Sequence, residues 1–189
     1  MPQRSTAAGL SLLELLLALI IMSTLAANAV PGLRTLLDNS AGELTMRRLA
    51  QAIEIGRIAA ITSSSLVTLC RSNNGLECGG QWHEGVLVFT DANGNRKIEQ
   101  QDRIIRHITF LDLAGKLSWR AFQNRQYLQI TALGFTRYQN GNFTYCPNDG
   151  IQAHIRQLII NRNGRIRFAQ DRDGDGIRED SRGEALHCD

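Results

Sequence analysis

Residues 9–31 read GLSLLELLLALIIMSTLAANAVP and hold much of the apolar content of the chain. The run from 10 to 30 contains a single charge, Glu14. About 20 helical residues, at about 1.5 Å each, span roughly 30 Å, which is the thickness of the hydrocarbon core of a bilayer. We therefore predict a membrane-spanning helix over residues 10–31.

The residues before this run are few and polar, and they carry one positive charge, at Arg4. An ordinary secretory signal has its small-residue cleavage site after the apolar run. Here Gly9 stands before the run, which favours a leader over residues 1–9. An A-N-A sequence at residues 27–29 leaves cleavage of the ordinary kind open as the alternative.

Glu14 is costly in an apolar helix, because a lone carboxylate there is unfavourable unless it is paired. Cleavage after Gly9 would place the new amino group of Leu10 one helical turn from Glu14, in the same chain or in a neighbour. A cation from a neighbouring subunit would then neutralise Glu14 during assembly. Snorkelling of the Glu14 side chain to the membrane interface is the alternative.

The rest of the chain predicts an α+β fold. Helical periodicity resumes after Pro31-Gly32, which should bend or locally melt the helix, and predicts an amphipathic helix over residues 32–62. The apolar stripe of this helix consists of Leu33, Leu37, Leu44, Leu49, Ile53 and Ala60. From residue 63 the pattern becomes strand-like, with Asn-Gly turn signals between the runs. The expected strands are 66–70, 85–90, 104–110, 117–122, 128–132, 142–146, 155–160 and 165–168. We predict a long N-terminal helix packed on a small two-sheet antiparallel β domain over residues 63–189.

The sequence GLSLLELL at residues 9–16 resembles the prepilin cleavage motif of type IV pilins and type II secretion pseudopilins. In that family a prepilin peptidase cuts after the glycine, here Gly9, and methylates the new N-terminus, here Leu10. The resemblance implies a single-pass precursor in the inner membrane with its soluble domain in the periplasm. It also implies assembly, through Glu14, with other major and minor pilins into a fibre at the cell surface.

The β region resembles the GspH/FimT branch of minor pilins and pseudopilins. The segments that carry this resemblance are 70–78, 80–94, 134–146 and 158–167. The resemblance covers most of the chain and implies the pilin fold.

The chain has four cysteines, Cys70, Cys78, Cys146 and Cys188. An even number behind an export signal indicates disulfides, and three connectivities are possible. One of them pairs Cys70 with Cys78 across a short loop and leaves Cys146 for Cys188. By the chain-entropy account these two bonds are worth about 2.5 and about 4 kcal/mol. The family resemblance favours this pairing. Free-thiol catalysis is the alternative, although no arrangement of a histidine and a base near a cysteine is evident.

Arginines gather near the C-terminal strands. On a strand, Arg165 and Arg167 point to the same face, roughly 7 Å apart, which suits contact with successive phosphates. Arg156 and Arg162 precede them, with no acidic residue in between. In the FimT subgroup a GRxR motif of this form is associated with DNA binding, which implies weak, non-specific contact with double-stranded DNA. A solvated face with ordinary salt bridges is the alternative, because residues 151–189 contain seven arginines and seven acidic residues.

Two loops have the spacing of a calcium-binding loop. The first has the candidate ligands Asp171, Asp173, Asp175 and Asp180. Arg182 stands where the twelfth, bidentate acid is expected, and Asp180 is the candidate substitute. The second loop, residues 91–102, has Arg96 where the turn glycine belongs. Polar turns without a metal are the alternative for both loops, and no other cofactor is indicated.

No motif of an enzyme class is present, and the four histidines are scattered, so we do not expect an enzyme. The net charge of +3 is by itself too small to indicate nucleic-acid binding. The hypothesis is a minor pilin of a type IV pilus that contacts DNA during uptake in natural transformation. The alternative is an H-type pseudopilin of the type II secretion system, which acts in protein export.

Overall fold

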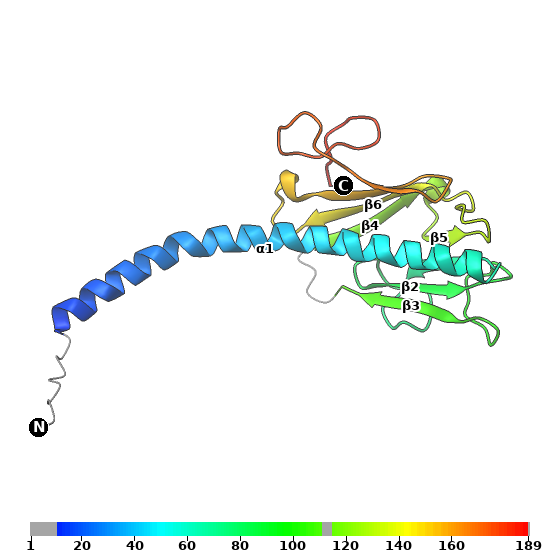
Figure 1. Cartoon of the computed structure of the whole chain (residues 1–189), viewed down its shortest axis with the longest axis horizontal. Coiled ribbons are helices and arrows are strands. Elements are labelled where there is room, and N and C mark those ends of the chain that lie inside the picture. Colours follow the sequence, from blue (N-terminus) through cyan, green and yellow to red (C-terminus); the bar gives the residue numbers. More distant parts are fainter. Residues whose placement is uncertain (1–10, 111–114, 189) are drawn as a thin grey trace, which may run out of the picture. The chain divides into compact units, whose positions relative to one another are not determined.

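The computed structural model of the chain describes residues 11–110 and 115–188, including their side chains except those of residues 28–39 (Figure 1). The chain separates into two units, Met1–Leu37 and Asp38–Asp189. A single helix, α1 (Leu12–Thr62), contributes to both units.

The helix α1 begins after Ser11, whose Oγ accepts a hydrogen bond from Glu14 N at 3.3 Å. This is an N-cap arrangement, and a carboxylate in the first turn suits the positive end of the helix dipole. The helical backbone continues through Pro31 and Gly32, so it does not melt at the predicted position. A proline forfeits a single intrahelical hydrogen bond, and the turns on either side maintain the helix.

The described residues after α1 form eight strands and two short 3₁₀ turns. The strands are β1 (Val67–Arg71), β2 (Gly85–Thr90), β3 (Ile104–Thr109), β4 (Gly115–Ala121), β5 (Tyr127–Ile130), β6 (Gly141–Pro147), β7 (Arg156–Ile160) and β8 (Ile166–Phe168). The 3₁₀ turns are η1 (Phe122–Asn124) and η2 (Gln152–His154). Each strand lies within two residues of its predicted bounds.

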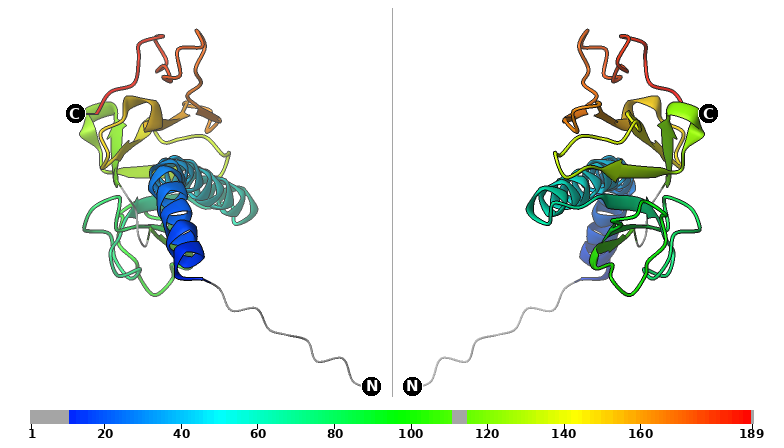
Figure 2. Two further views of the ribbon diagram at one scale, coloured as in Figure 1. Left: turned by 90° about the vertical axis from the view of Figure 1, so that its left-hand side faces the viewer. Right: turned by 90° about the vertical axis from the view of Figure 1, so that its right-hand side faces the viewer.

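The strands make two antiparallel sheets. The first sheet has the order β3-β2-β1-β5 and the second has the order β4-β6-β7-β8. Within the unit 38–189, the C-terminal half of α1 lies between the two sheets (Figures 1 and 2). The predicted α+β fold with two antiparallel sheets is therefore confirmed.

The core forms where the helix meets both sheets. Leu49, Ile53 and Ala60 of α1 are buried, as the predicted apolar stripe requires. Leu44, which the same stripe included, is 51% exposed, while Met46 is buried instead. A helix covered on two sides buries a wider band of residues than a helix on one sheet, so a single stripe misplaces some of them.

Two disulfides are present, Cys70–Cys78 and Cys146–Cys188, with Cα atoms 5.6 Å and 5.9 Å apart. This is the pairing that the family resemblance favours. The first bond closes the short loop after β1. The second ties the C-terminal tail to β6, so the tail is held against the second sheet.

Candidate functional site

A tight turn sets the position of the two predicted DNA-contacting arginines. Asn161 N donates to Arg165 O at 3.1 Å, and Arg165 N donates to Asn161 Oδ1 at 2.9 Å. Gly164 has a φ of +73°, and a Cβ at this position would collide with the carbonyl oxygen of Gly134. The glycine of the GRxR motif is therefore required by backbone conformation and by close packing.

Arg167 lies at the centre of β8, an edge strand of the second sheet, and Arg165 lies directly before this strand. Ile166 between them packs against the core, so the strand alternation turns both arginines outward. Arg167 lies opposite Ile159 of β7. Both arginines are exposed, and no described carboxylate forms an ion pair with either. The expected pair of outward-facing guanidinium groups is present, and contact with DNA stays a prediction.

Arg162 is also exposed, and its guanidinium lies over the ring of Tyr138, 5.7 Å from the ring centre. Thr136 connects the two segments, because its N and Oγ1 both donate to Arg162 O, at 3.0 and 3.1 Å. Tyr138 is 63% exposed. This aromatic neighbour was not predicted, because no local sequence pattern links Tyr138 to an arginine on a different strand connection.

Arg156 does not belong to this surface, and its prediction as a DNA contact is wrong. It shares the inner face of β7 with Leu158 and Ile160, and it is buried. Its Nη1 donates to the carbonyls of Ala153 and Ile155, at 2.7 and 2.9 Å. Burial lowers the pKa of Arg156, and the charge of Arg178 lowers it further.

Glu43 on α1 partly offsets these effects on the pKa of Arg156, since its Oε2 lies 3.7 Å from Arg156 Nε. Arg156 thus joins the helix to the second sheet. The surrounding protein covers this guanidinium, so a DNA phosphate in solvent cannot reach it.

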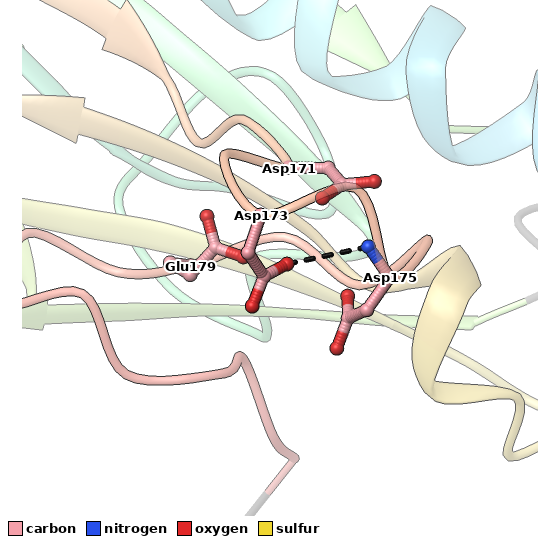
Figure 3. Close-up of side chains that lie close together, drawn as sticks. All are labelled: Asp171, Asp173, Asp175 and Glu179. Carbon is pink, nitrogen blue, oxygen red and sulfur yellow. Dashed lines mark hydrogen bonds between the residues drawn. The ribbon is translucent and has the colours of Figure 1, made fainter.

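The acidic loop gathers four carboxylates, shown in Figure 3. They are Asp171, Asp173, Asp175 and Glu179, whose ligand oxygens all lie within 4.8 Å of one another. Asp171 accepts hydrogen bonds from Gly174 N at 2.7 Å and Gly176 N at 2.9 Å. Asp173 Oδ1 accepts one from Asp175 N at 3.3 Å (Figure 3). Oxygen donors of this kind are those that Ca²⁺ takes, and calcium binding at this loop stays a prediction.

Asp180 is not part of the gathered set, in contrast to the predicted ligand list. Its carboxylate accepts hydrogen bonds from Arg182 N, Arg182 Nε and Glu184 N, at 2.7, 3.2 and 3.1 Å. Glu179 takes its place and is largely buried. Glu179 stands at the ninth position counted from Asp171, which is a ligand position in calcium loops, so the sequence did carry the signal.

The residues predicted for processing and assembly belong to the unit Met1–Leu37. Gly9 and Leu10 lie outside the described residues. Glu14 is exposed in the first turn of α1. Within the described residues, no helix combines the length and the apolar character needed to cross a membrane.

Comparison with known proteins identifies the family. The family described as type II transport protein GspH matches residues 45–164, which is more than half of the chain. No curated protein is similar enough to the chain to count as a relative.

The fold of the chain is similar to that of a solved minor pilin. The type IV minor pilin FimU of Pseudomonas aeruginosa is 19% identical, with a TM-score of 0.50 over 69% of this chain and 87% of that chain. The minor pseudopilin EpsH from the type 2 secretion system of Vibrio cholerae is 11% identical, with a TM-score of 0.48 over 67% of this chain and 94% of that chain. From the family match and the shared fold, the chain belongs to the GspH family of minor pilins and pseudopilins, which are structural subunits rather than enzymes.

Proposed function

We propose that this chain is a minor pilin of a type IV pilus. Prepilin peptidase cuts the precursor after Gly9 and methylates Leu10, and the segment 10–31 holds the precursor in the inner membrane. The soluble domain stays in the periplasm until the subunit joins other pilins in the fibre. The likeness of the fold to the type IV minor pilin FimU supports the pilus. The large apolar side chains from Leu12 to Leu25, which are exposed within their own unit, support the membrane segment.

The finer part of the proposal is that the subunit contacts the backbone of double-stranded DNA through Arg165 and Arg167. The observation that carries it is the exposure of both guanidinium groups on one face without a carboxylate partner among the described residues. An unpaired arginine is available for bidentate contact with a phosphate, whereas a paired one must first lose its partner. Arg162 lies on the same strand connection and adds a third exposed cation.

A gel-shift titration tests the DNA contact. The full chain in detergent is titrated against a linear duplex at several salt concentrations, beside the variant Arg165→Gln/Arg167→Gln. Each phosphate contact contributes about 0.9 to the slope of log affinity against log salt. The variant should bind every DNA sequence tested more weakly than the wild type. The magnitude of its slope of log affinity against log salt should be smaller by about two.

A charge-matched control separates this surface from the overall charge. Arg172→Gln/Arg182→Gln removes two exposed arginines from the acidic tail, where Arg182 already pairs with Asp180 and Glu184. This variant should keep the binding and the salt slope of the wild type. Equal loss in both double variants, or no loss in the first, would count against the DNA contact.

A type II secretion pseudopilin is the second candidate, and the description of the matching family favours it. Deletion of the gene distinguishes the two functions. Loss of pili with normal export of secreted enzymes supports the pilus, whereas retained pili with loss of export supports the secretion system.

A further inference from the structure

The loop between β2 and β3 has the register of a calcium-binding loop. Asp91, Asn93, Asn95 and Glu99 occupy the first, third, fifth and ninth positions, and residue 97 offers a backbone carbonyl at the seventh. Ile98, at the eighth, packs against the small apolar cluster of Leu87 and Phe89. The loop is therefore anchored to the outer side of the first sheet.

Asp91 carries the observation that points to a ligand. Its side chain is fully buried, and its Oδ2 accepts hydrogen bonds from Thr68 Oγ1, Gln129 Nε2 and Arg96 N, at 2.6, 3.2 and 3.1 Å. Its other oxygen, Oδ1, is buried without a hydrogen-bond partner among the described residues. No described cation pairs with this carboxylate either. A buried carboxylate oxygen without a donor or a cation is unfavourable, and a metal ion in the loop would satisfy it.

Arg96 is compatible with the backbone conformation of a calcium-binding loop. It stands at the sixth position, where calcium loops have a glycine, and it adopts the required left-handed conformation with a φ of +64°. Its guanidinium lies over the ring of Tyr127, 4.8 Å from the ring centre. Arg96 N donates to Asp91 Oδ2, as Gly176 N donates to Asp171 Oδ2 in the acidic loop.

The side chains of Asn93 and Asn95 meet at Glu99. Asn93 Nδ2 and Asn95 Nδ2 donate to the two oxygens of Glu99, at 2.9 and 3.0 Å, so three side chains already gather there. Asn93 Oδ1 and Asn95 Oδ1 each accept one backbone hydrogen bond and keep a second lone pair.

We propose that residues 91–99 bind one calcium ion through Asp91 Oδ1, the amide oxygens of Asn93 and Asn95, the carbonyl of residue 97, and Glu99. All the donors are oxygens, and most are neutral, which suits Ca²⁺ rather than a transition metal. With two carboxylates, the site belongs with the weak sites of extracellular modules, whose dissociation constants are about 10⁻⁴ to 10⁻³ M.

The test uses the full chain in detergent, stripped of metal and titrated with calcium chloride by calorimetry. All proteins carry Asp173→Asn and Asp175→Asn, so that the acidic loop does not contribute. This background should bind one Ca²⁺ per chain and should melt at a higher temperature with calcium than with a chelator. Addition of Glu99→Gln should weaken binding at least tenfold.

Glu99 is the residue of choice because it is exposed, whereas replacement of the buried Asp91 could unfold the protein. Glu77→Gln removes an exposed carboxylate outside both loops and should leave calcium binding unchanged. The proposal is overturned if the background binds no calcium at about 10 mM, roughly ten times the weakest dissociation constant expected. It is also overturned if Glu99→Gln binds as well as Glu77→Gln.

Discussion

At the scale of single residues, Asp149 stabilises the turn before β7. Its Oδ1 accepts a hydrogen bond from Ile151 N at 2.8 Å, and its Oδ2 lies 2.7 Å from His154 Nδ1. Burial acts to raise the pKa of Asp149, but the two hydrogen bonds and the charge of His154 outweigh it. The pKa of this carboxyl is therefore held below its ordinary value of 3.8.

A depressed pKa in the folded state means that Asp149 stabilises the protein above pH 3.8 and that this contribution fades as the pH falls through the folded pKa. Asp149→Asn should lower the free energy of unfolding at pH 7 by about 1 kcal/mol. The difference from the wild type should shrink below pH 3.8. Urea unfolding between pH 7 and pH 2 measures it. A difference that stays constant over this range would show that His154 and Asp149 do not interact as described.

At the scale of elements, the C-terminal tail has no regular strand or helix of its own among residues 169–188. It is held by bridges that pair Glu179 with Gln170 and Ala185, and by Leu186, which is buried with Ile155. The Cys146–Cys188 bond closes this arrangement. The tail therefore depends on the Cys146–Cys188 disulfide for its position, whereas hydrogen bonds between strands hold the two sheets together.

Removal of that link should cost more stability than removal of the other disulfide. The Cys146–Cys188 bond spans 42 residues and Cys70–Cys78 spans 8, and the longer loop gains more from closure. Cys146→Ser/Cys188→Ser should lower the free energy of unfolding by about 4 kcal/mol, and Cys70→Ser/Cys78→Ser by about 2.5 kcal/mol. Chemical denaturation of the two double variants compares them, and the reverse order of effects would refute the loop-length explanation.

The elements were predictable because half-buried strands alternate and Asn-Gly turns separate them. Alternation also places Arg165 and Arg167 on the outer face, as expected. It fails for Arg156 because the sequence does not reveal that a charged residue accompanies Leu158 and Ile160 into the core. The unpartnered oxygen of Asp91 was beyond sequence reasoning for a related reason. Its burial depends on side chains from β1 and β5, which are remote in sequence.

At the scale of the whole molecule, the proposed functions fall in different units. Assembly through Glu14 belongs to the unit Met1–Leu37, and the proposed contacts with DNA and calcium belong to the unit Asp38–Asp189. The buried core lies within residues 38–189, and Glu14 lies in the other unit. A change at Glu14 should therefore leave the β domain intact while it affects assembly.

Glu14→Val should abolish or slow incorporation into fibres, because the proposed partner cation loses its carboxylate. Its melting temperature should equal that of the wild type, since no core residue is touched. Glu14→Asp keeps the charge and serves as the control, which should retain part of the incorporation. Immunoblots of sheared fibres measure the outcome, and normal incorporation of Glu14→Val would refute the pairing.

The edge strand β8 of the second sheet has a consequence for encounters between copies of this domain. An open sheet edge invites a strand from another molecule, and such pairing leads to aggregates. β8 is three residues long and carries Arg167 at its centre, so two such edges would repel one another. The charge of Arg167 should therefore disfavour edge-to-edge pairing between two copies of this domain.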